Sequence, residues 1–85
     1  MVSFTTKILD YLLNIKGVEV SVFLYERKKD EVKASMRSSA LNLSEIAKIF
    51  GGGGHMHAAG CTINAPLQEA YLKLSTVVCN VMEAL

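Results

Sequence analysis

Two short runs of alternating apolar and polar residues constrain this 85-residue chain more than any other feature. In residues 18–24 the even positions are all aliphatic, and in residues 32–36 the even positions are again apolar. A period of two places alternate side chains on opposite faces of a β-strand. A charged stretch, residues 27–31, separates the two runs. The pattern therefore predicts a β-hairpin with one apolar face.

The parity of these positions also restricts the hairpin loop. The two apolar faces coincide only if even residues lie beside even residues, so an odd loop, most simply of three residues, is favoured over two. Asp30 suits the left-handed conformation that such a loop needs. A further short strand is expected at residues 61–64, after the glycine-rich segment.

Three segments show the apolar spacing of helices. The first is capped by Thr5 or Thr6 and stops at Gly17, the second begins after Asn42 with Glu45 completing a capping-box pattern, and the third starts at Pro66. The expected apolar positions are Ile8, Leu9, Leu12, Leu13 and Ile15, then Leu43, Ile46, Ala47 and Phe50, then Leu67, Ala70, Tyr71, Leu74, Val77, Val78, Val81 and Leu85. The predicted order is α-β-β-α-β-α, an α+β (broadly α/β) fold with a small mixed sheet packed with helices. We treat residues 1–85 as one domain.

Composition and charge exclude several classes of protein. Hydrophobic residues make up 51% of the chain, which excludes a disordered protein, and no apolar run is long enough to span a membrane. A net charge of +1 is low for a general nucleic-acid binder. Two cysteines, Cys61 and Cys79, do not make a disulfide framework. We therefore expect a soluble, cytoplasmic domain.

Four consecutive glycines, Gly51 to Gly54, are the main candidate functional feature. Such a run is conformationally costly, which implies that the backbone must approach another group closely or adopt dihedral angles forbidden to other residues. Consecutive amides without side chains can form a nest around an anion, and His55 follows at once. Arg37 supplies a planar fork that suits phosphate, and residues 32–57 carry a local excess of +2. The segment therefore predicts a phosphate site.

Each of these features also has a structural explanation. A glycine run is often only a flexible loop, and an arginine at a strand end is usually solvated. Ser38 is most simply part of the strand end, although its hydroxyl can also meet a phosphate. His55, His57 and Cys61 have the residue types of a partial zinc site, but their spacing does not match the usual paired ligands.

Five segments together resemble the DHH-associated domain, the C-terminal domain of DHH-family phosphoesterases. They are residues 18–20, 37–39, 44–48, 51–55 and 58–61. The resemblance is strongest to the bacterial oligoribonuclease type that also dephosphorylates 3′-phosphoadenosine 5′-phosphate. It spans nearly the whole chain, and the Gly-Gly-Gly-His sequence followed by Ala-Ala-Gly is its most specific part.

The resemblance implies a division of labour. Catalysis belongs to an N-terminal DHH domain that binds two manganese ions, and this chain lacks its motifs, as its scarcity of carboxylates also indicates. No catalytic residue and no metal ligand are therefore assigned here. The implied substrate-binding residues are Arg37, Ser38, Gly52, Gly53, Gly54, His55 and His57. Family members have further strands upstream, so we expect this chain to be part of a longer phosphoesterase.

The leading hypothesis is thus a domain that binds nucleotide or short-RNA phosphate beside the DHH domain of its parent chain. The isolated chain is expected to be inactive, even with manganese, and to fold without metal. A homodimer remains compatible with the sequence, and no membrane partner is expected. Two alternatives stay open: a nucleic-acid-binding module like that of alanyl-tRNA synthetase, and a small metal-binding or interaction domain built on His55, His57 and Cys61.

Overall fold

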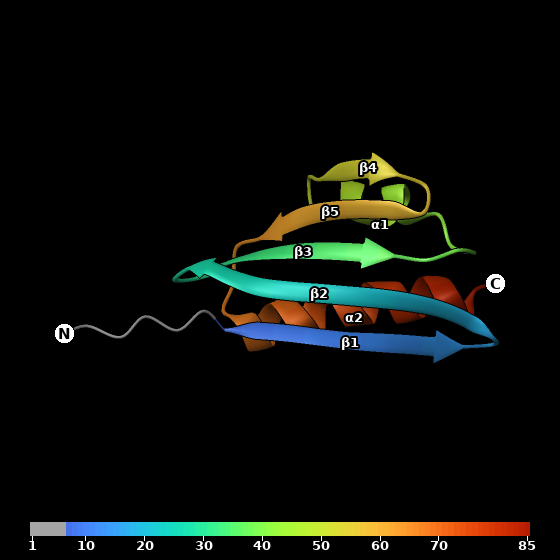
Figure 1. Cartoon of the computed structure of the whole chain (residues 1–85), viewed down its shortest axis with the longest axis horizontal. Helices are drawn as coiled ribbons and strands as arrows, with labels where there is room; N and C mark the ends of the chain where they lie inside the picture. The colour runs from blue at the N-terminus through green and yellow to red at the C-terminus, as the bar shows by residue number, and fades with distance from the viewer. Residues whose placement is uncertain (1–6) are drawn as a thin grey trace.

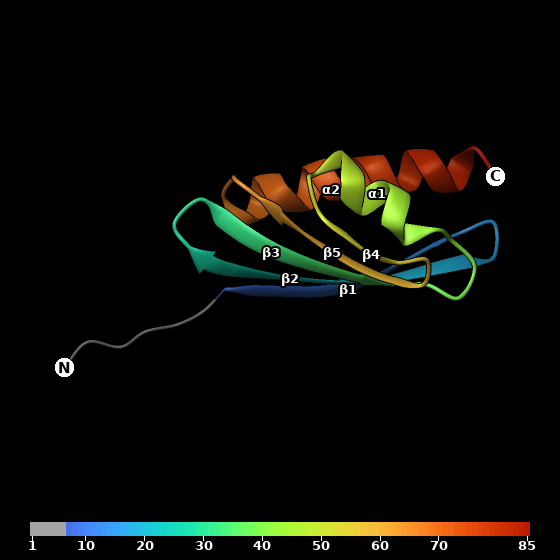
Figure 2. The same cartoon turned by 90° about the horizontal axis from the view of Figure 1, so that it is seen from above.

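The computed structural model describes residues 7–85 and contains a five-stranded antiparallel sheet with both described helices on one face (Figure 1 and Figure 2). The elements are β1 Ile8–Ile15, β2 Val18–Lys28, β3 Glu31–Arg37, α1 Leu43–Ile49, β4 Gly53–His55, β5 Ala58–Ile63 and α2 Leu67–Glu83. Their order across the sheet is β1-β2-β3-β5-β4. The predicted α+β class is confirmed. No helix within the described residues is long and apolar enough to cross a membrane.

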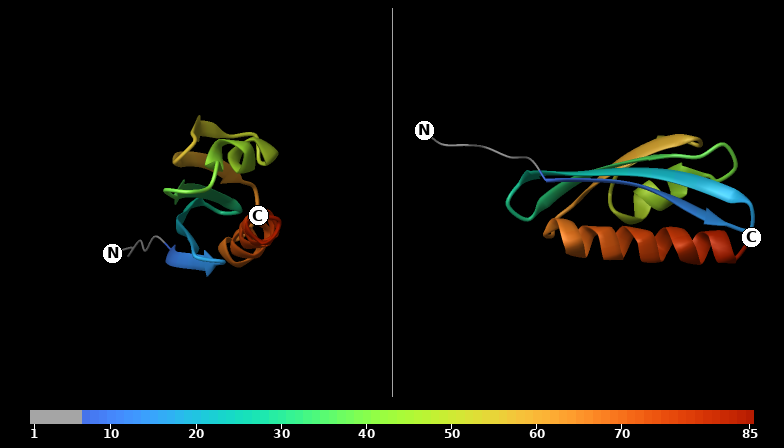
Figure 3. Two further views of the ribbon diagram at one scale, coloured as in Figure 1. Left: turned by 90° about the vertical axis from the view of Figure 1, so that its right-hand side faces the viewer. Right: turned by 60° about the horizontal axis from the view of Figure 1, so that its bottom comes forward.

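The core lies between the sheet and its two helices. α2 packs against β1, β2 and β3, whereas α1 packs against β4 and β5. The even positions of β2 and β3 are buried as the alternation predicts, from Val20 to Leu24 and from Val32 to Met36. Seen end-on, both helices lie on the same side of the sheet (Figure 3). The opposite side, which no helix of residues 7–85 covers, is called the open face below.

The predicted first helix is wrong, because residues 8–15 form strand β1. Odd positions of β1 face α2, and Tyr11 and Leu13 pack against the core. Even positions lie on the open face, where Ile8 and Leu12 stay about half exposed. Because both faces of β1 carry apolar side chains, its sequence has the apolar spacing of a helix. The segment forms a strand because it pairs with β2 along its whole length. The proposed caps, Thr5 and Thr6, lie outside the described residues.

Gly17 ends a strand rather than a helix. Lys16 and Gly17 both have positive φ, 54° and 77°, and connect β1 to β2 as a two-residue turn. Two positive φ values match the type I′ turn, whose twist suits antiparallel strands. All neighbouring strands are antiparallel, so the expectation of a mixed sheet is also wrong.

The β2–β3 connection confirms the parity argument but not the loop length. Val22 lies opposite Met36 and Leu24 opposite Ala34, so the apolar faces coincide. The turn itself has two residues, Lys29 and Asp30, because a bulge between Glu26 and Lys28 absorbs the odd residue. Asp30 has the predicted left-handed conformation, with φ of 58°.

The second and third predicted helices are confirmed. Asn42 caps α1 by accepting a hydrogen bond from the Ser44 amide at 3.2 Å, while Glu45 pairs with Lys48 at 3.5 Å instead of completing a capping box. In α2 the buried stripe consists of Ala70, Leu74, Val78 and Met82. Met82 takes the core position that was expected for the exposed Leu85.

Tyr11 joins β1 to α2 and provides a first testable prediction. Its hydroxyl lies 2.7 Å from Ser75 Oγ, its ring meets Tyr71 edge-on at 5.0 Å, and burial raises the pKa of Tyr11. Since the folded state resists ionisation of this phenol, its contribution to stability is complete below pH 10 and is lost as the pH rises above that value. We expect Tyr11→Phe to lower the free energy of unfolding by about 1 kcal/mol at pH 7.

Urea denaturation at pH 7 and pH 11 measures this effect. The difference between wild type and Tyr11→Phe should shrink or change sign at pH 11, because only the wild type ionises there at this position. Ser75→Ala, which keeps the Tyr11 hydroxyl, is the matched control and should retain the alkaline loss of stability. A gap that is unchanged between the two pH values would contradict this interpretation.

Candidate phosphate site on the open face

The glycine run first serves to end α1. Gly51 has a φ of 77°, and its amide donates to Lys48 O at 3.0 Å. The Gly52 amide donates to Ala47 O at 2.8 Å. This pair of hydrogen bonds is the Schellman motif, which uses a left-handed residue to satisfy the last helical carbonyls. The first two glycines therefore have a structural role.

Gly53 and Gly54 belong to the edge strand β4, and Gly52, just before it, also closely approaches β5. A Cβ on Gly52 would overlap the Gly60 carbonyl oxygen and lie 2.7 Å from the Cys61 Cβ. A Cβ on Gly54, whose φ is 140°, would lie 2.7 Å from the Ala58 carbonyl oxygen. A Cβ on Gly53, by contrast, would have no neighbour within 4 Å. Packing thus requires glycine at 52 and 54, whereas position 53 faces open space.

This geometry contradicts the predicted amide nest. Gly53 to His55 pair with β5 as an extended strand, in which successive N–H groups point in opposite directions. The Gly52 amide is already bonded to the end of α1. The amides of residues 52–54 therefore do not converge on one anion. What the glycines provide is a surface without side chains.

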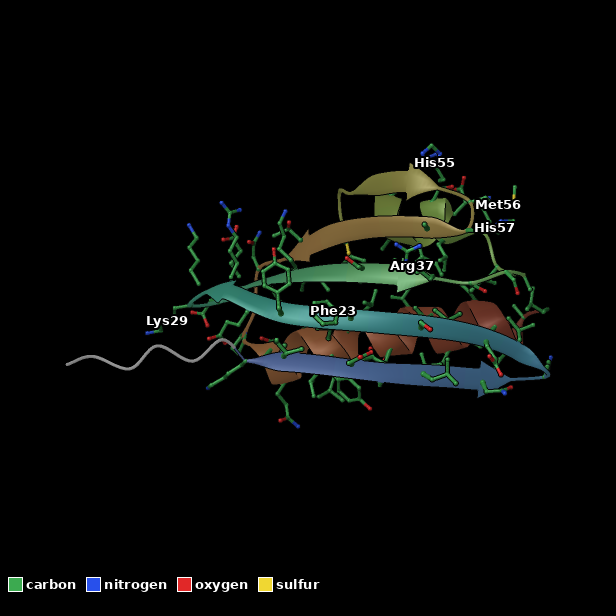
Figure 4. All side chains as sticks on the ribbon, in the orientation of Figure 1. Phe23, Lys29, Arg37, His55, Met56 and His57 are labelled. Carbon is green, nitrogen blue, oxygen red and sulfur yellow. The ribbon has the colours of Figure 1, made fainter. Side chains whose placement is uncertain are left out.

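Arg37 and His55 lie in one row across the open face. Arg37 at the end of β3 is opposite Ala58 of β5, and Ala58 is opposite His55 of β4. With two inter-strand spacings between them, the Cα atoms of Arg37 and His55 are about 10 Å apart. Both side chains are exposed, and Arg37 projects from β3 toward β5 (Figure 4). Ala58, with its small side chain, separates the cation from the imidazole.

The next row of the open face has a floor of small residues. Ser35, Gly60 and Gly53 lie opposite one another on β3, β5 and β4. Together with Arg37, Gly54 and Ala58 they line a hollow of about 260 Å³. The residues that line this hollow include one cation and no carboxylate. The arrangement suits an anion that the Arg37 guanidinium binds over the small residues of the sheet surface.

Two of the predicted site residues, Ser38 and His57, do not line the hollow at Arg37, Gly53 and Gly54. The Ser38 hydroxyl donates to Glu19 O at 2.7 Å and accepts from the amides of Ala40 and Leu41. Its buried side chain therefore holds the loop that leads to α1. His57 is exposed in the β4–β5 turn, where its carbonyl accepts from the Ser38 amide at 3.2 Å. Both residues line a separate hollow with Arg37 and Glu19.

The residues of the alternative zinc site do not converge. Cys61 faces the core from β5, whereas His55 belongs to the open face. Within residues 7–85 no three His, Cys, Asp or Glu side chains are placed to hold a metal ion. Burial raises the pKa of the Cys61 thiol, while nearby Lys33 partly opposes this shift. Cys61 is thus a core residue.

Sequence reasoning missed the floor of the site and the aromatic residue beside it. Ser35 and Gly60 form the floor, and Phe23, which is 39% exposed, lies opposite Ser35 on β2 (Figure 4). The signal that identifies Ser35 and Phe23 is parity. They occupy the odd positions of their strands, as Arg37 does, and therefore share its face.

Comparison with protein families assigns the chain to a known domain family. Residues 5–83 match the model of the DHHA1 domain. The chain belongs to this family. The resemblance to the DHH-associated domain is thereby confirmed, and the glycine strand, His55 and Arg37 all lie within the matched range.

Three curated relatives share one name, Bifunctional oligoribonuclease and PAP phosphatase NrnA. This chain is 34% identical to the protein from Mycoplasma genitalium over 55 residues, which are 65% of this chain and 17% of the relative. It is 32% identical to the Mycoplasma pneumoniae protein over 57 residues, 67% of this chain and 18% of the relative. Identity to the Thermus thermophilus protein is 43% over 67 residues, 75% of this chain and 20% of the relative. The chain thus spans about a fifth of these relatives.

Proposed function

We propose that this DHHA1 domain binds the phosphate of short oligoribonucleotides or 3′,5′-bisphosphonucleotides for a cytoplasmic, manganese-dependent phosphoesterase. The observation that supports this most is the position of Arg37. It makes no ion pair with any residue of 7–85 and stands beside a floor of small residues on the open face. A guanidinium without a carboxylate partner retains its full capacity for a phosphate.

In this proposal the domain contributes binding and orientation. Arg37 donates to the phosphate oxygens, His55 donates from β4 on the far side of β5, and Gly53 lets the ligand lie close to the sheet. A DHH domain in the parent chain supplies the manganese ions and the hydrolytic chemistry. Because residues 7–85 lack a cluster that fits such ions, no chemical step is assigned to them. Fixing the nucleotide in this way lowers the entropic cost of reaching the metals.

Calorimetric titration of the 85-residue chain with adenosine 5′-monophosphate and with adenosine tests the proposal. We expect the nucleotide to bind at least about tenfold more tightly than the nucleoside, since one charge-assisted contact accounts for that ratio. Raising the salt concentration should weaken the binding of the nucleotide and leave the binding of the nucleoside unchanged. Equal affinities for the two ligands would contradict a phosphate site.

A further inference from the structure

The open face continues beyond Arg37 into a second, larger hollow. This hollow has a volume of about 460 Å³ and includes Tyr25, Lys33, Gly51 and Thr62 in its lining. It shares Ser35 and Gly60 with the hollow at Arg37. The two hollows therefore adjoin along β3 and β5, and together they are here called the trough.

A cation stands at each end of the trough. Lys33 and Arg37 are four residues apart on β3, which separates their Cα atoms by about 13 Å. Neither makes an ion pair within residues 7–85, and no carboxylate lines either hollow. Elsewhere, Arg27 and Lys28 share the Glu31 carboxylate, Lys48 pairs with Glu45 and Lys73 pairs with Glu69, whereas Lys29 in the hairpin turn makes no ion pair within residues 7–85.

The Lys33 ammonium is held toward the trough. Its Nζ donates to Oγ1 of Thr62, a residue of the neighbouring strand β5, at 3.0 Å. Lys33 and Thr62 lie directly opposite each other in the sheet and both belong to the second hollow. An ammonium has three donors, and a neutral hydroxyl occupies one of them without compensating the charge. Lys33 is therefore fixed in position and still able to bind an anion.

Two aromatic residues of β2 lie beside the segment of β3 that joins the two cations. Phe23 lies opposite Ser35, and Tyr25 lies opposite Lys33. Their ring centroids are 6.1 Å apart, and Tyr25 lines the second hollow, whereas Phe23 lies next to Tyr25 and lines neither hollow. Aromatic side chains beside a cationic groove are typical of surfaces that bind single-stranded nucleic acid, because any base can stack on them.

We propose that the trough binds two successive nucleotides of a single-stranded oligoribonucleotide, with one phosphate at Arg37 and a second at Lys33. This inference rests on the proposed function and adds a second anion subsite to it. With their Cα atoms about 13 Å apart, Lys33 and Arg37 are placed to act as two separate anion subsites. Lys33 consequently determines a preference for ligands of two or more nucleotides over mononucleotides.

The test compares Lys33→Gln with wild type in binding two ligands, adenosine 5′-monophosphate and the 5′-phosphorylated diadenylate. Glutamine removes the charge but keeps a donor within reach of Thr62. We expect the affinity for the dinucleotide to fall about fivefold or more, with mononucleotide affinity unchanged. The slope of log affinity against log salt should decrease by about 0.7 for the dinucleotide, the value for one lost contact with a single strand.

Lys73→Gln is the matched control, since it removes the same charge from α2 on the other side of the sheet. It should leave both affinities and the salt slope at their wild-type values. If Lys33→Gln weakens the binding of both ligands equally, or weakens the binding of neither, the second subsite is overturned. If Arg37→Ala still weakens the mononucleotide in that case, the proposed function stands and only this inference fails. If Arg37→Ala has no effect on the mononucleotide, the proposed function itself fails.

Discussion

Arg37→Ala should weaken binding of adenosine 5′-monophosphate by about 10- to 150-fold, because it removes a charge-assisted contact of about 1.5–3 kcal/mol. Arg37 is exposed at the end of β3, so its removal leaves no cavity in the core. The free energy of unfolding should therefore stay within about 0.5 kcal/mol of wild type. Calorimetric titration measures the affinity, and urea denaturation confirms the fold.

Arg27→Ala is the matched control for this prediction. Arg27 is also an exposed arginine, but it pairs with Glu31 at the hairpin turn and lines neither hollow of the trough. We expect its replacement to change nucleotide affinity less than about twofold, through long-range charge alone. Equal losses in the two variants would mean that net charge, rather than a site at Arg37, determines binding.

Adjacent glycines should respond in opposite ways to the same added methyl group. In Gly52→Ala the new Cβ meets the Gly60 carbonyl and Cys61, both within the sheet, so the backbone must shift. Overpacking of this kind costs about 1–3 kcal/mol. For a domain of this size the melting temperature should fall by about 4–24 °C. In Gly53→Ala nothing lies within 4 Å of the Cβ, and stability should not fall.

Gly53→Ala, the variant that should keep its stability, is the one expected to lose nucleotide affinity. The methyl group of Gly53→Ala rises from the floor of the hollow at Arg37, where the proposal places the nucleotide. We expect at least about a fivefold loss of adenosine 5′-monophosphate affinity, because overlapping groups in a well-packed contact cost 1 kcal/mol or more. Unchanged affinity in a folded Gly53→Ala protein would show that the ligand does not use this floor.

How far the sequence predicts this fold depends on how well one face of each element is buried. The even positions of β2 and β3 are apolar and buried from Val20 to Leu24 and from Val32 to Met36, so parity predicts which faces of the two strands coincide. β1 carries Ile8 and Leu12 on its open side, and this hides its period. Only the presence of β2 beside it, a tertiary contact, decides between helix and strand.

The candidate site shows the same division. Arg37, Gly53 and His55 can be selected from residue type and spacing, and the sheet brings them to one face. The nest was a wrong prediction because a run of glycines does not reveal whether its backbone is curved or extended. Ser38 was selected for a hydroxyl that the structure uses to hold a loop. Ser35 and Gly60 have no chemistry of their own and gain importance only as the floor between Arg37 and Lys33.

The most direct test of the phosphate site is an NMR titration of the 85-residue chain with 3′-phosphoadenosine 5′-phosphate. Saturable shifts are expected for the amides of Ser35, Arg37, Gly53, His55 and Gly60, all on the open face. An apolar hollow of about 440 Å³ between α1 and α2, lined by Ile49, Leu72 and Thr76 among others, is the competing location. The amide signals of the residues that line this hollow should not shift. Shifts confined to that hollow, or scattered over the surface without saturation, would contradict a phosphate site on the open face.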